Sequence, residues 1–201
     1  MNDDLGAFTD FASSYGQAAA SLEAQVLADL LYGAAGVGPD MDDGNPLFHS
    51  SHNNVAGSGA AIGDATLTAG RLALRQTTGL DGSTILETTP KYLLAPAALE
   101  TTAQKALASI YPATTANANV FTNALTLLTD PRLDAKSITR WWLFGDPSAV
   151  PVLEYSYLEG AAGPQVTTRL GWDVLGQEFR CVLDFGAGAI GYRCAYTNAG
   201  A

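Results

Sequence analysis

Apolar side chains recur at three- and four-residue steps near the start of the chain. The series comprises Phe8, Phe11, Tyr15, Ala18, Leu22, Val26 and Leu30. This spacing predicts one helix over residues 8–32, with Thr9 or Asp10 as a cap at its start and Gly33 at its end. At ~1.5 Å per residue the helix would be roughly 36 Å long, about twice the mean of ~11–12 residues. The core of one compact globule would hardly cover it, so we expect it to span the body or to pack partly on neighbouring molecules.

The periodicity disappears over residues 33–63, where Gly, Asp, Asn, Ser and Pro crowd the sequence. We expect a long loop there, which in a compact domain is usually functional or mobile. Asp64 or Thr66 can cap a second helix, which carries three leucines and ends near Gly79. The dipeptide Asp81-Gly82 then predicts a turn.

Shorter apolar runs follow, separated by turn-forming residues. A strand is predicted over 91–95, a third helix from Pro96 to about Ile110, and a polar loop over 111–123. Further strands are predicted over 124–129, 141–144, 152–158, 165–171, 178–185 and 190–196.

The segment Gly186-Ala187-Gly188 is interpreted as a turn or bulge between the last two strands. With helices in the first half and strands in the last third, the pattern predicts an α+β fold. At 201 residues and 20.9 kDa, the chain fits a single body over 1–201, with room for two lobes.

Charged residues make up only 15% of the chain, against ~25% in an average protein. This low fraction favours a surface that is partly covered by partners. The net charge is −10, and the only lysines are Lys91, Lys105 and Lys136. Phosphate binding needs clustered Lys and Arg, so we expect no direct nucleic-acid-binding surface.

Cys181 and Cys194 are too few for a secreted disulfide framework. No secretory signal is present, and no apolar run approaches the ~20 residues of a membrane span. We expect a soluble chain made in a reducing cytosol. The two cysteines could face each other across a regular hairpin, but the favoured interpretation is two small buried hydrophobes. Trp141, Trp142 and Trp172 are interpreted as core or interface filling.

The sharpest polar cluster is His49-Ser50-Ser51-His52, which follows Asp40, Asp42 and Asp43. Two histidines and three carboxylates could ligate zinc or a transition metal. A polar loop with turn-forming residues is the favoured interpretation, because no Cys or Glu at ligand spacing completes a set. A calcium loop fails as well, since its glycine falls one place early and its twelfth position is Ser51.

Other catalytic patterns fail too. The chain has no Gly-x-Ser-x-Gly elbow, and Ala56-Gly57-Ser58-Gly59-Ala60 is only a small-residue loop. Gly186-Ala187-Gly188 lacks the third glycine and the helix of a dinucleotide fingerprint. We therefore assign no catalytic, cofactor-binding or metal-ligating residue, and expect a protein that works by contact with other chains rather than an enzyme.

Several stretches, taken in order, resemble the major capsid proteins of tailed phages with the Hong Kong 97 fold, in the branch of the phage Mu major head subunit. They are the helix over 8–31, Leu47-Phe48-His49-x-x-His52-x-Asn54, Leu67 to Thr78 with Gly82, Thr89-Pro90-Lys91-Tyr92-Leu93-Leu94-Ala95-Pro96, Leu99-Glu100-Thr101-Thr102-Ala103, Asp130-Pro131-Arg132-Leu133 with Trp141-Trp142-Leu143, Leu158-Glu159-Gly160-x-x-Gly163-Pro164, and Asp184-Phe185-Gly186. Each is short, and their order and spacing together carry the resemblance.

The resemblance implies a peripheral lobe over 8–32 and 150–201 and an axial lobe over 33–149. It also implies that the chain self-assembles into pentamers and hexamers of an icosahedral shell, in a phage or prophage virion, after synthesis in the host cytoplasm. Relatives of the branch occur fused to a prohead protease. The partners implied are therefore other copies, a prohead protease, a scaffold and a portal, with no cofactor and no membrane.

In the family an N-terminal arm and an extended loop precede the long helix, whereas here the helix is predicted to start about seven residues after Met1. We therefore expect these two elements to be absent, as in a truncated chain, a processed fragment or the C-terminal part of a fusion, and we expect no cross-linking site. Two other functions stay open. One is a metal-dependent hydrolase that uses the His49/His52 loop, and the other is a different virion component, such as a decoration or tail protein.

Overall fold

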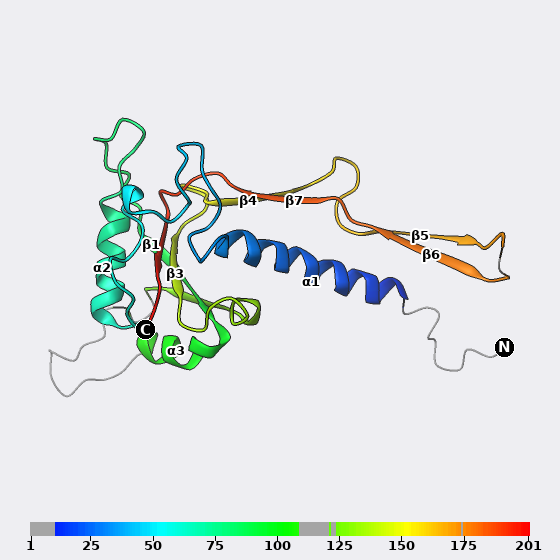
Figure 1. The fold of residues 1–201 in the computed structure, drawn as a ribbon, viewed down its shortest axis with the longest axis horizontal. Helices are drawn as coiled ribbons and strands as arrows, with labels where there is room; N and C mark the ends of the chain where they lie inside the picture. The colour runs from blue at the N-terminus through cyan, green and yellow to red at the C-terminus, as the bar shows by residue number, and fades with distance from the viewer. Residues whose placement is uncertain (1–10, 109–120, 122–123, 174) are drawn as a thin grey trace. The chain divides into compact units, whose positions relative to one another are not determined.

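The computed structural model describes residues 11–108, 121, 124–173 and 175–201 (Figure 1). The chain divides into two compact units. Unit 1 consists of Met1–Leu27 and Tyr155–Gly188, and unit 2 of Ala28–Glu154 and Ala189–Ala201. Helices and mixed sheets together confirm the α+β class.

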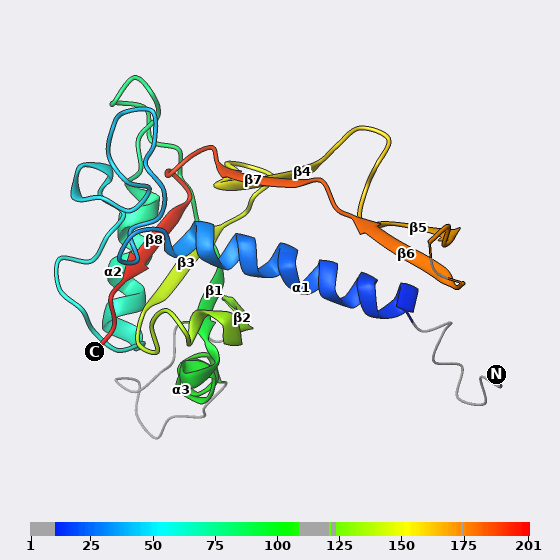
Figure 2. The same ribbon diagram turned by 45° about the vertical axis from the view of Figure 1, so that its right-hand side comes forward.

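Unit 2 is built on a four-stranded sheet with the strand order β2-β1-β3-β8 (Figure 2). The strands are β1 (Pro90–Pro96), β2 (Thr126–Asp130), β3 (Trp141–Gly145) and β8 (Ala195–Asn198). Strand β1 pairs in parallel with β2 and antiparallel with β3, and β3 pairs antiparallel with β8. A parallel pair needs a crossover connection, and the segment between β1 and β2 includes η2 (Ala97–Leu99) and α3 (Glu100–Leu107).

Strand β3 is apolar along its length because both of its faces are covered. Side chains alternate between the faces of a strand, so Trp141 and Leu143 enter one core cluster while Trp142 enters another. Helices α2 and α3 contribute Leu67, Leu74 and Ala103 to the first cluster. The last turns of α1 and the following loop contribute Ala28, Leu31, Leu47 and Phe48 to the second. A strand buried on both faces has no polar alternation, which explains the run Trp-Trp-Leu-Phe.

Helix α1 (Phe11–Tyr32) follows the predicted helix within the described residues; positions 8–10, including the predicted caps, lie outside them. Gly33 ends α1 as predicted. Its φ is +54°, and its amide donates to the Asp29 carbonyl at 2.8 Å. Helices commonly end at a residue with positive φ. Glycine is favoured at that position because it has no Cβ, which would be strained in this conformation.

Helix α2 (Asp64–Arg75) begins as predicted and ends earlier than the expected Gly79. The Thr66 hydroxyl accepts a hydrogen bond from the Gly63 amide at 3.0 Å, which satisfies a free donor at the start of the helix. Gly70 lets α2 lie close to the sheet, because a Cβ there would stand 2.7 Å from Leu143 Cδ1. Helix α3 covers the middle of the predicted third helix, and the predicted loop over 111–123 lies outside the described residues except for Phe121.

Unit 1 combines the first part of α1 with two two-stranded sheets. These are β4–β7, with β4 (Leu153–Tyr157) and β7 (Phe185–Ala189), and β5–β6, with β5 (Gln165–Leu170) and β6 (Gln177–Val182). The first residues of β4, the last residue of β7 and the end of α1 belong to unit 2. Within unit 1, Glu23 of α1 accepts a hydrogen bond from the Tyr157 hydroxyl, which raises the pKa of that tyrosine.

The predicted strand 178–185 is confirmed as β6 except that β6 ends at Val182, the predicted strand 190–196 overlaps β8 only at its last two residues, and the predicted turn between them is wrong. Residues 186–188 lie inside strand β7, and neither Gly186 nor Gly188 has a positive φ. The chain leaves its strand earlier, at Leu183 and Asp184, and 190–194 are not a strand. A Gly-Ala-Gly run adopts extended backbone as readily as a turn, so pairing with β4 decides its conformation.

The cysteines therefore do not face each other. Cys181 lies opposite Val166 in the β5–β6 pair. Cys194 precedes β8 and is buried beside Gly145, as the hydrophobe interpretation predicted. Burial raises the pKa of the Cys194 thiol, and both cysteines are free. Trp141 and Trp142 are fully buried core residues, whereas Trp172 is exposed and fills no core.

Candidate functional site

The loop over 33–63 is an ordered part of unit 2. It contains two backbone bridges, Gly33 to Gly38 and Asp40 to Pro46. The short 3-10 helix η1 (Ser50–His52) carries the second histidine. The His49 ring caps this helix by accepting from the Ser51 amide at 3.3 Å. The two histidines thus take different structural positions.

His52 is buried, and both of its ring nitrogens face hydrogen-bond acceptors. Nδ1 lies 3.1 Å from the Leu47 carbonyl, and Nε2 lies 2.8 Å from an Asp43 carboxylate oxygen. A neutral imidazole carries only one N–H, so both bonds form only when the ring is protonated. The ring also stacks on Tyr192, with centroids 3.7 Å apart and planes at 5°. His52 therefore joins the loop to the segment before β8.

Asn54 completes this connection. Its side-chain nitrogen donates to the Leu47 carbonyl at 2.8 Å, and its side-chain oxygen accepts from the His49 amide at 3.0 Å. Its backbone carbonyl accepts from the Thr197 amide in β8 at 2.9 Å. The motif Leu47-Phe48-His49-x-x-His52-x-Asn54 thus buries two apolar side chains and fastens the loop to the sheet. Its contacts are structural.

The three predicted carboxylates do not gather around the histidines. Only Asp43 reaches His52, and hydrogen bonds from Asn45 and then from His52 hold the pKa of Asp43 well below its usual range. Among the described residues no group of three His, Cys, Asp or Glu side chains could hold a metal ion. This geometry does not favour the hydrolase alternative.

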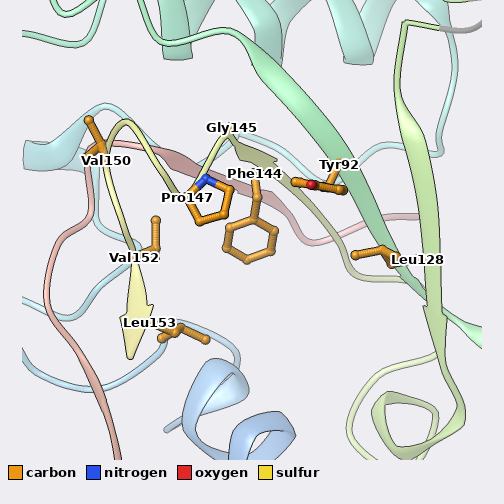
Figure 3. A pocket seen from close by; sticks show the side chains of 8 residues that line it. All are labelled: Tyr92, Leu128, Phe144, Gly145, Pro147, Val150, Val152 and Leu153. Carbon is orange, nitrogen blue, oxygen red and sulfur yellow. The ribbon is translucent and has the colours of Figure 1, made fainter. Parts of the chain in front are cut away.

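An apolar hollow of about 240 Å³ opens on unit 2 (Figure 3). Its lining is formed by Tyr92, Leu128, Phe144, Gly145, Pro147, Val150, Val152 and Leu153. Phe144 and Pro147 stand at the centre of the view in Figure 3, between Tyr92 and Leu128 on one side and the two valines on the other. The hollow is smaller than the ~300–1,000 Å³ of usual ligand sites, and among its lining residues only Tyr92 carries a polar side-chain group.

The turn between β5 and β6 forms a projecting apolar tip in unit 1. The Gly171 amide donates to the Gly176 carbonyl at 2.8 Å and closes the turn. Trp172 is 97% exposed, and Leu170 and Leu175 are also largely exposed. We call Leu170, Trp172 and Leu175 the hairpin tip. A tryptophan leaves much apolar surface in water at such a position, and contiguous exposed apolar surface commonly marks an interaction site.

A second projection lies in unit 2, where Leu80 is 93% exposed. The Asp81 carboxylate accepts from the amides of Ser83 and Thr84 and from both of their hydroxyls, which orders this turn and holds the pKa of Asp81 below its usual range. Neither projection was predicted from the sequence. The sequence nevertheless carries a signal for both projections, namely an apolar residue beside a turn-forming glycine in Gly171-Trp172 and Gly79-Leu80. A side chain at such a turn has no core to enter.

Exposed apolar projections and an apolar hollow favour a protein that acts by contact. The comparison with protein families agrees, because the model of a family described as phage capsid protein matches residues 1–198. The chain belongs to this phage capsid protein family. A search of curated proteins finds no match.

Membership of this family supports a structural role in the capsid of the virion. The family is one of shell proteins rather than enzymes, in agreement with the expectation from sequence. None of the described helices is both long and apolar enough to cross a membrane.

Proposed function

We propose that the chain is a structural subunit of the icosahedral capsid of a tailed phage or prophage, and that it assembles through pentamers and hexamers. The observation that carries this proposal is the family match over nearly the whole chain. Each copy in such a shell contacts several others, so much of its surface needs to suit protein contact.

The distribution of exposed apolar side chains supports the proposal. Among the described residues of unit 1, Ala19 is the only buried one. Large apolar side chains including Leu22, Tyr155 and Leu158 are more than half exposed there. With only 15% charged residues, little of this surface is strongly hydrated, so burial against neighbouring copies would be favourable.

We further propose that the fold is of the Hong Kong 97 type, in the branch of the phage Mu major head subunit. Residues 8–32 and 150–201 would form the peripheral lobe, and 33–149 the axial lobe. A 22-residue helix α1 and the long two-stranded ribbons support the first assignment. Strands β1, β2 and β3 with α2 and α3 support the second, whereas β8 (Ala195–Asn198) lies in the range 150–201 and pairs with β3 in the same sheet.

Assembly of such a shell involves other proteins. We propose that the chain meets a prohead protease, a scaffold and a portal in the host cytoplasm, as the resemblance implies. Its principal partner is a second copy of itself.

The test is electron microscopy of the protein, expressed from its complete reading frame together with any neighbouring protease gene. Uniform closed shells are expected, with rings of five and six subunits visible after averaging. Mass photometry at rising concentration supplies a second readout. Monomers at every concentration would contradict the proposal and would favour a decoration or tail role.

A further inference from the structure

We infer that the hairpin tip of one copy inserts Trp172 into the apolar hollow of a neighbouring copy, an inference that rests on the proposed function. The occupant of the hollow is thus a second copy of this chain. The contact joins a surface of unit 1 to a different surface of unit 2.

The tip lacks any cover in the described structure. Trp172 is 97% exposed, and the flanking Leu170 and Leu175 are also exposed. Strands β5 and β6 pair only with each other, and a lone two-stranded hairpin is marginal in water. The Arg169–Glu178 ion pair, with Nε and Oε2 2.6 Å apart, holds the strands together just below the turn. The tip is therefore a defined projection that gains stability when another surface covers it.

The hollow matches one large apolar side chain in size and in chemistry. Its volume is about 240 Å³, enough for a single aromatic group and small for a cofactor. Phe144 and Tyr92 offer rings beside which an indole can lie offset or edge-on, which aromatic pairs prefer. Leu128 at its margin is 46% exposed, so this apolar rim is also open to a partner. Interfaces commonly concentrate their binding energy in a tryptophan seated in such a pocket.

A second copy is favoured over an unrelated partner because the two surfaces differ. When one patch of a subunit binds a different patch of the next, the contact is head-to-tail, and it forms a ring when the rotation between copies closes. Rings are the units of the proposed shell. Trp172 with its two leucines can cover only a fraction of the ~800 Å² per partner of a stable interface. The contact alone would be weak, as suits a subunit that is also held by other neighbours.

The charges beside the two surfaces permit this approach. Copies of a chain with a net charge of −10 repel one another. The tip, however, is flanked by the Arg169–Glu178 pair, and the hollow by the Lys91–Asp146 pair at 2.7 Å. Each pair is neutral as a unit. The remaining charge at the tip is the exposed Asp173, which would meet the margin that carries Lys91.

The first experiment is photo-crosslinking of the assembled full chain. Trp172 is replaced by benzoylphenylalanine, an aromatic of similar size, and an equal mixture with unmodified, isotope-labelled chain is assembled and irradiated. Mass spectrometry is expected to find crosslinks from position 172 to peptides containing Leu128 or residues 144–153 of the labelled chain. Crosslinks confined to one chain, or to peptides elsewhere in a neighbour, would overturn the inference.

The second experiment compares assembly of three variants that change exposed positions. Trp172→Ser and Leu128→Glu are each expected to raise the concentration needed for assembly at least about tenfold, as loss of a buried aromatic anchor does. Ile138→Ser, at a 59% exposed position outside both surfaces, is expected to change it less than about twofold. Equal effects of all three would mean that general hydrophobicity drives assembly, against the inference. Unchanged circular dichroism and unfolding midpoints show that each variant folds.

The outcomes separate this contact from the proposed function. Shells from the wild-type chain with crosslinks outside the hollow would overturn the contact and leave the capsid role. A wild-type chain that stays monomeric would overturn both. Shells whose crosslinks join Trp172 of one copy to the hollow of another support both.

Discussion

Units 1 and 2 contain the same kinds of elements and differ in how much they bury. Unit 2 holds two core clusters, centred on Trp141 and Trp142, whose side chains are fully buried. Unit 1, within the described residues, buries only Ala19. The contrast teaches that unit 2 folds around cores of its own, whereas unit 1 leaves much of its apolar surface exposed.

The pairing of strands explains part of this difference. Unit 2 has a four-stranded sheet covered on both faces, whereas the ribbons of unit 1 have two strands each. Tyr155, Tyr157 and Phe185 form an aromatic cluster on one ribbon, with centroids 5.6–6.0 Å apart. Tyr155 nevertheless stays more than half exposed. A substitution in unit 2 should therefore affect folding, and one in unit 1 should affect assembly.

The largest expected effect contrasts two tryptophans. Trp142→Ala in unit 2 is expected to lower the free energy of unfolding by about 3–5 kcal/mol, because it leaves a large cavity in a closed core. Trp172→Ala in unit 1 should change it by less than about 0.5 kcal/mol in the unassembled chain. Urea unfolding followed by circular dichroism measures both. Similar losses for the two variants would contradict the division into a core unit and a contact unit.

A second contrast uses two glycines inside helices. Gly70→Ala in α2 is expected to lower the free energy of unfolding by about 1–3 kcal/mol, because its Cβ would overlap Leu143 and Tyr196 in the core. Gly16→Ala in α1 meets nothing within 4 Å. It should stabilise the helix by up to about 1 kcal/mol, since alanine has the higher helix propensity. Thermal unfolding of the pair distinguishes the two signs.

The third contrast lies within unit 2 and concerns two neighbouring indoles. Trp141 Nε1 donates to the Ala60 carbonyl at 3.0 Å, whereas Trp142 Nε1 is buried without a partner among the described residues. Trp141→Phe should therefore cost about 1 kcal/mol more than Trp142→Phe, which removes an unsatisfied donor. The two variants create comparable cavities, so urea midpoints compare them directly. A larger loss for Trp142→Phe would contradict this assignment of the donors.

The smallest expected effect is an acid-dependent loss of stability. The pKa values of Asp43, Asp81 and Asp146 are all lowered in the folded chain, chiefly by side-chain hydrogen bonds. A lowered pKa stabilises the fold above the ordinary aspartate value of 3.8. That stabilisation is lost as the pH falls below this value.

Asp43→Asn should flatten the decrease in unfolding free energy between neutral pH and about pH 2. Asp42→Asn serves as the control, because Asp42 makes no side-chain hydrogen bond to any residue that the structure describes. The expected result is a steeper acid profile for wild type and Asp42→Asn than for Asp43→Asn. Identical profiles for all three chains would show that the Asp43–His52 pair contributes nothing measurable.

Much of unit 2 was predictable because its elements carry strong local patterns. The apolar periodicity predicted α2, as it did α1, most of which lies in unit 1, and the runs around 91–95 and 141–144 predicted β1 and β3. The buried tryptophans in the second run followed from the same pattern. For the candidate site, the sequence predicted only that no set of catalytic residues is present.

The C-terminal third shows where prediction from sequence stopped. Gly186-Ala187-Gly188 suited a turn and a strand equally, and pairing with β4 selected the strand. A tryptophan suits a core as well as an interface. The residue type alone therefore did not decide which of the two Trp172 occupies. Its exposure depends on where the hairpin turns; Gly171 beside it marks that turn but does not decide whether another segment covers the indole.

By itself, then, the sequence of this protein determined which segments are helical, which strands are buried on both faces, and that the chain carries few charges. These properties depend on local spacing and composition. Only the tertiary structure decided that β1 and β2 pair in parallel, that His52 and Asn54 fasten a loop to β8, and that the hairpin tip and the hollow are open. Each of these depends on contacts between residues far apart in sequence. Such contacts stabilise the fold only after the distant segments have come together, which costs loop-closure entropy.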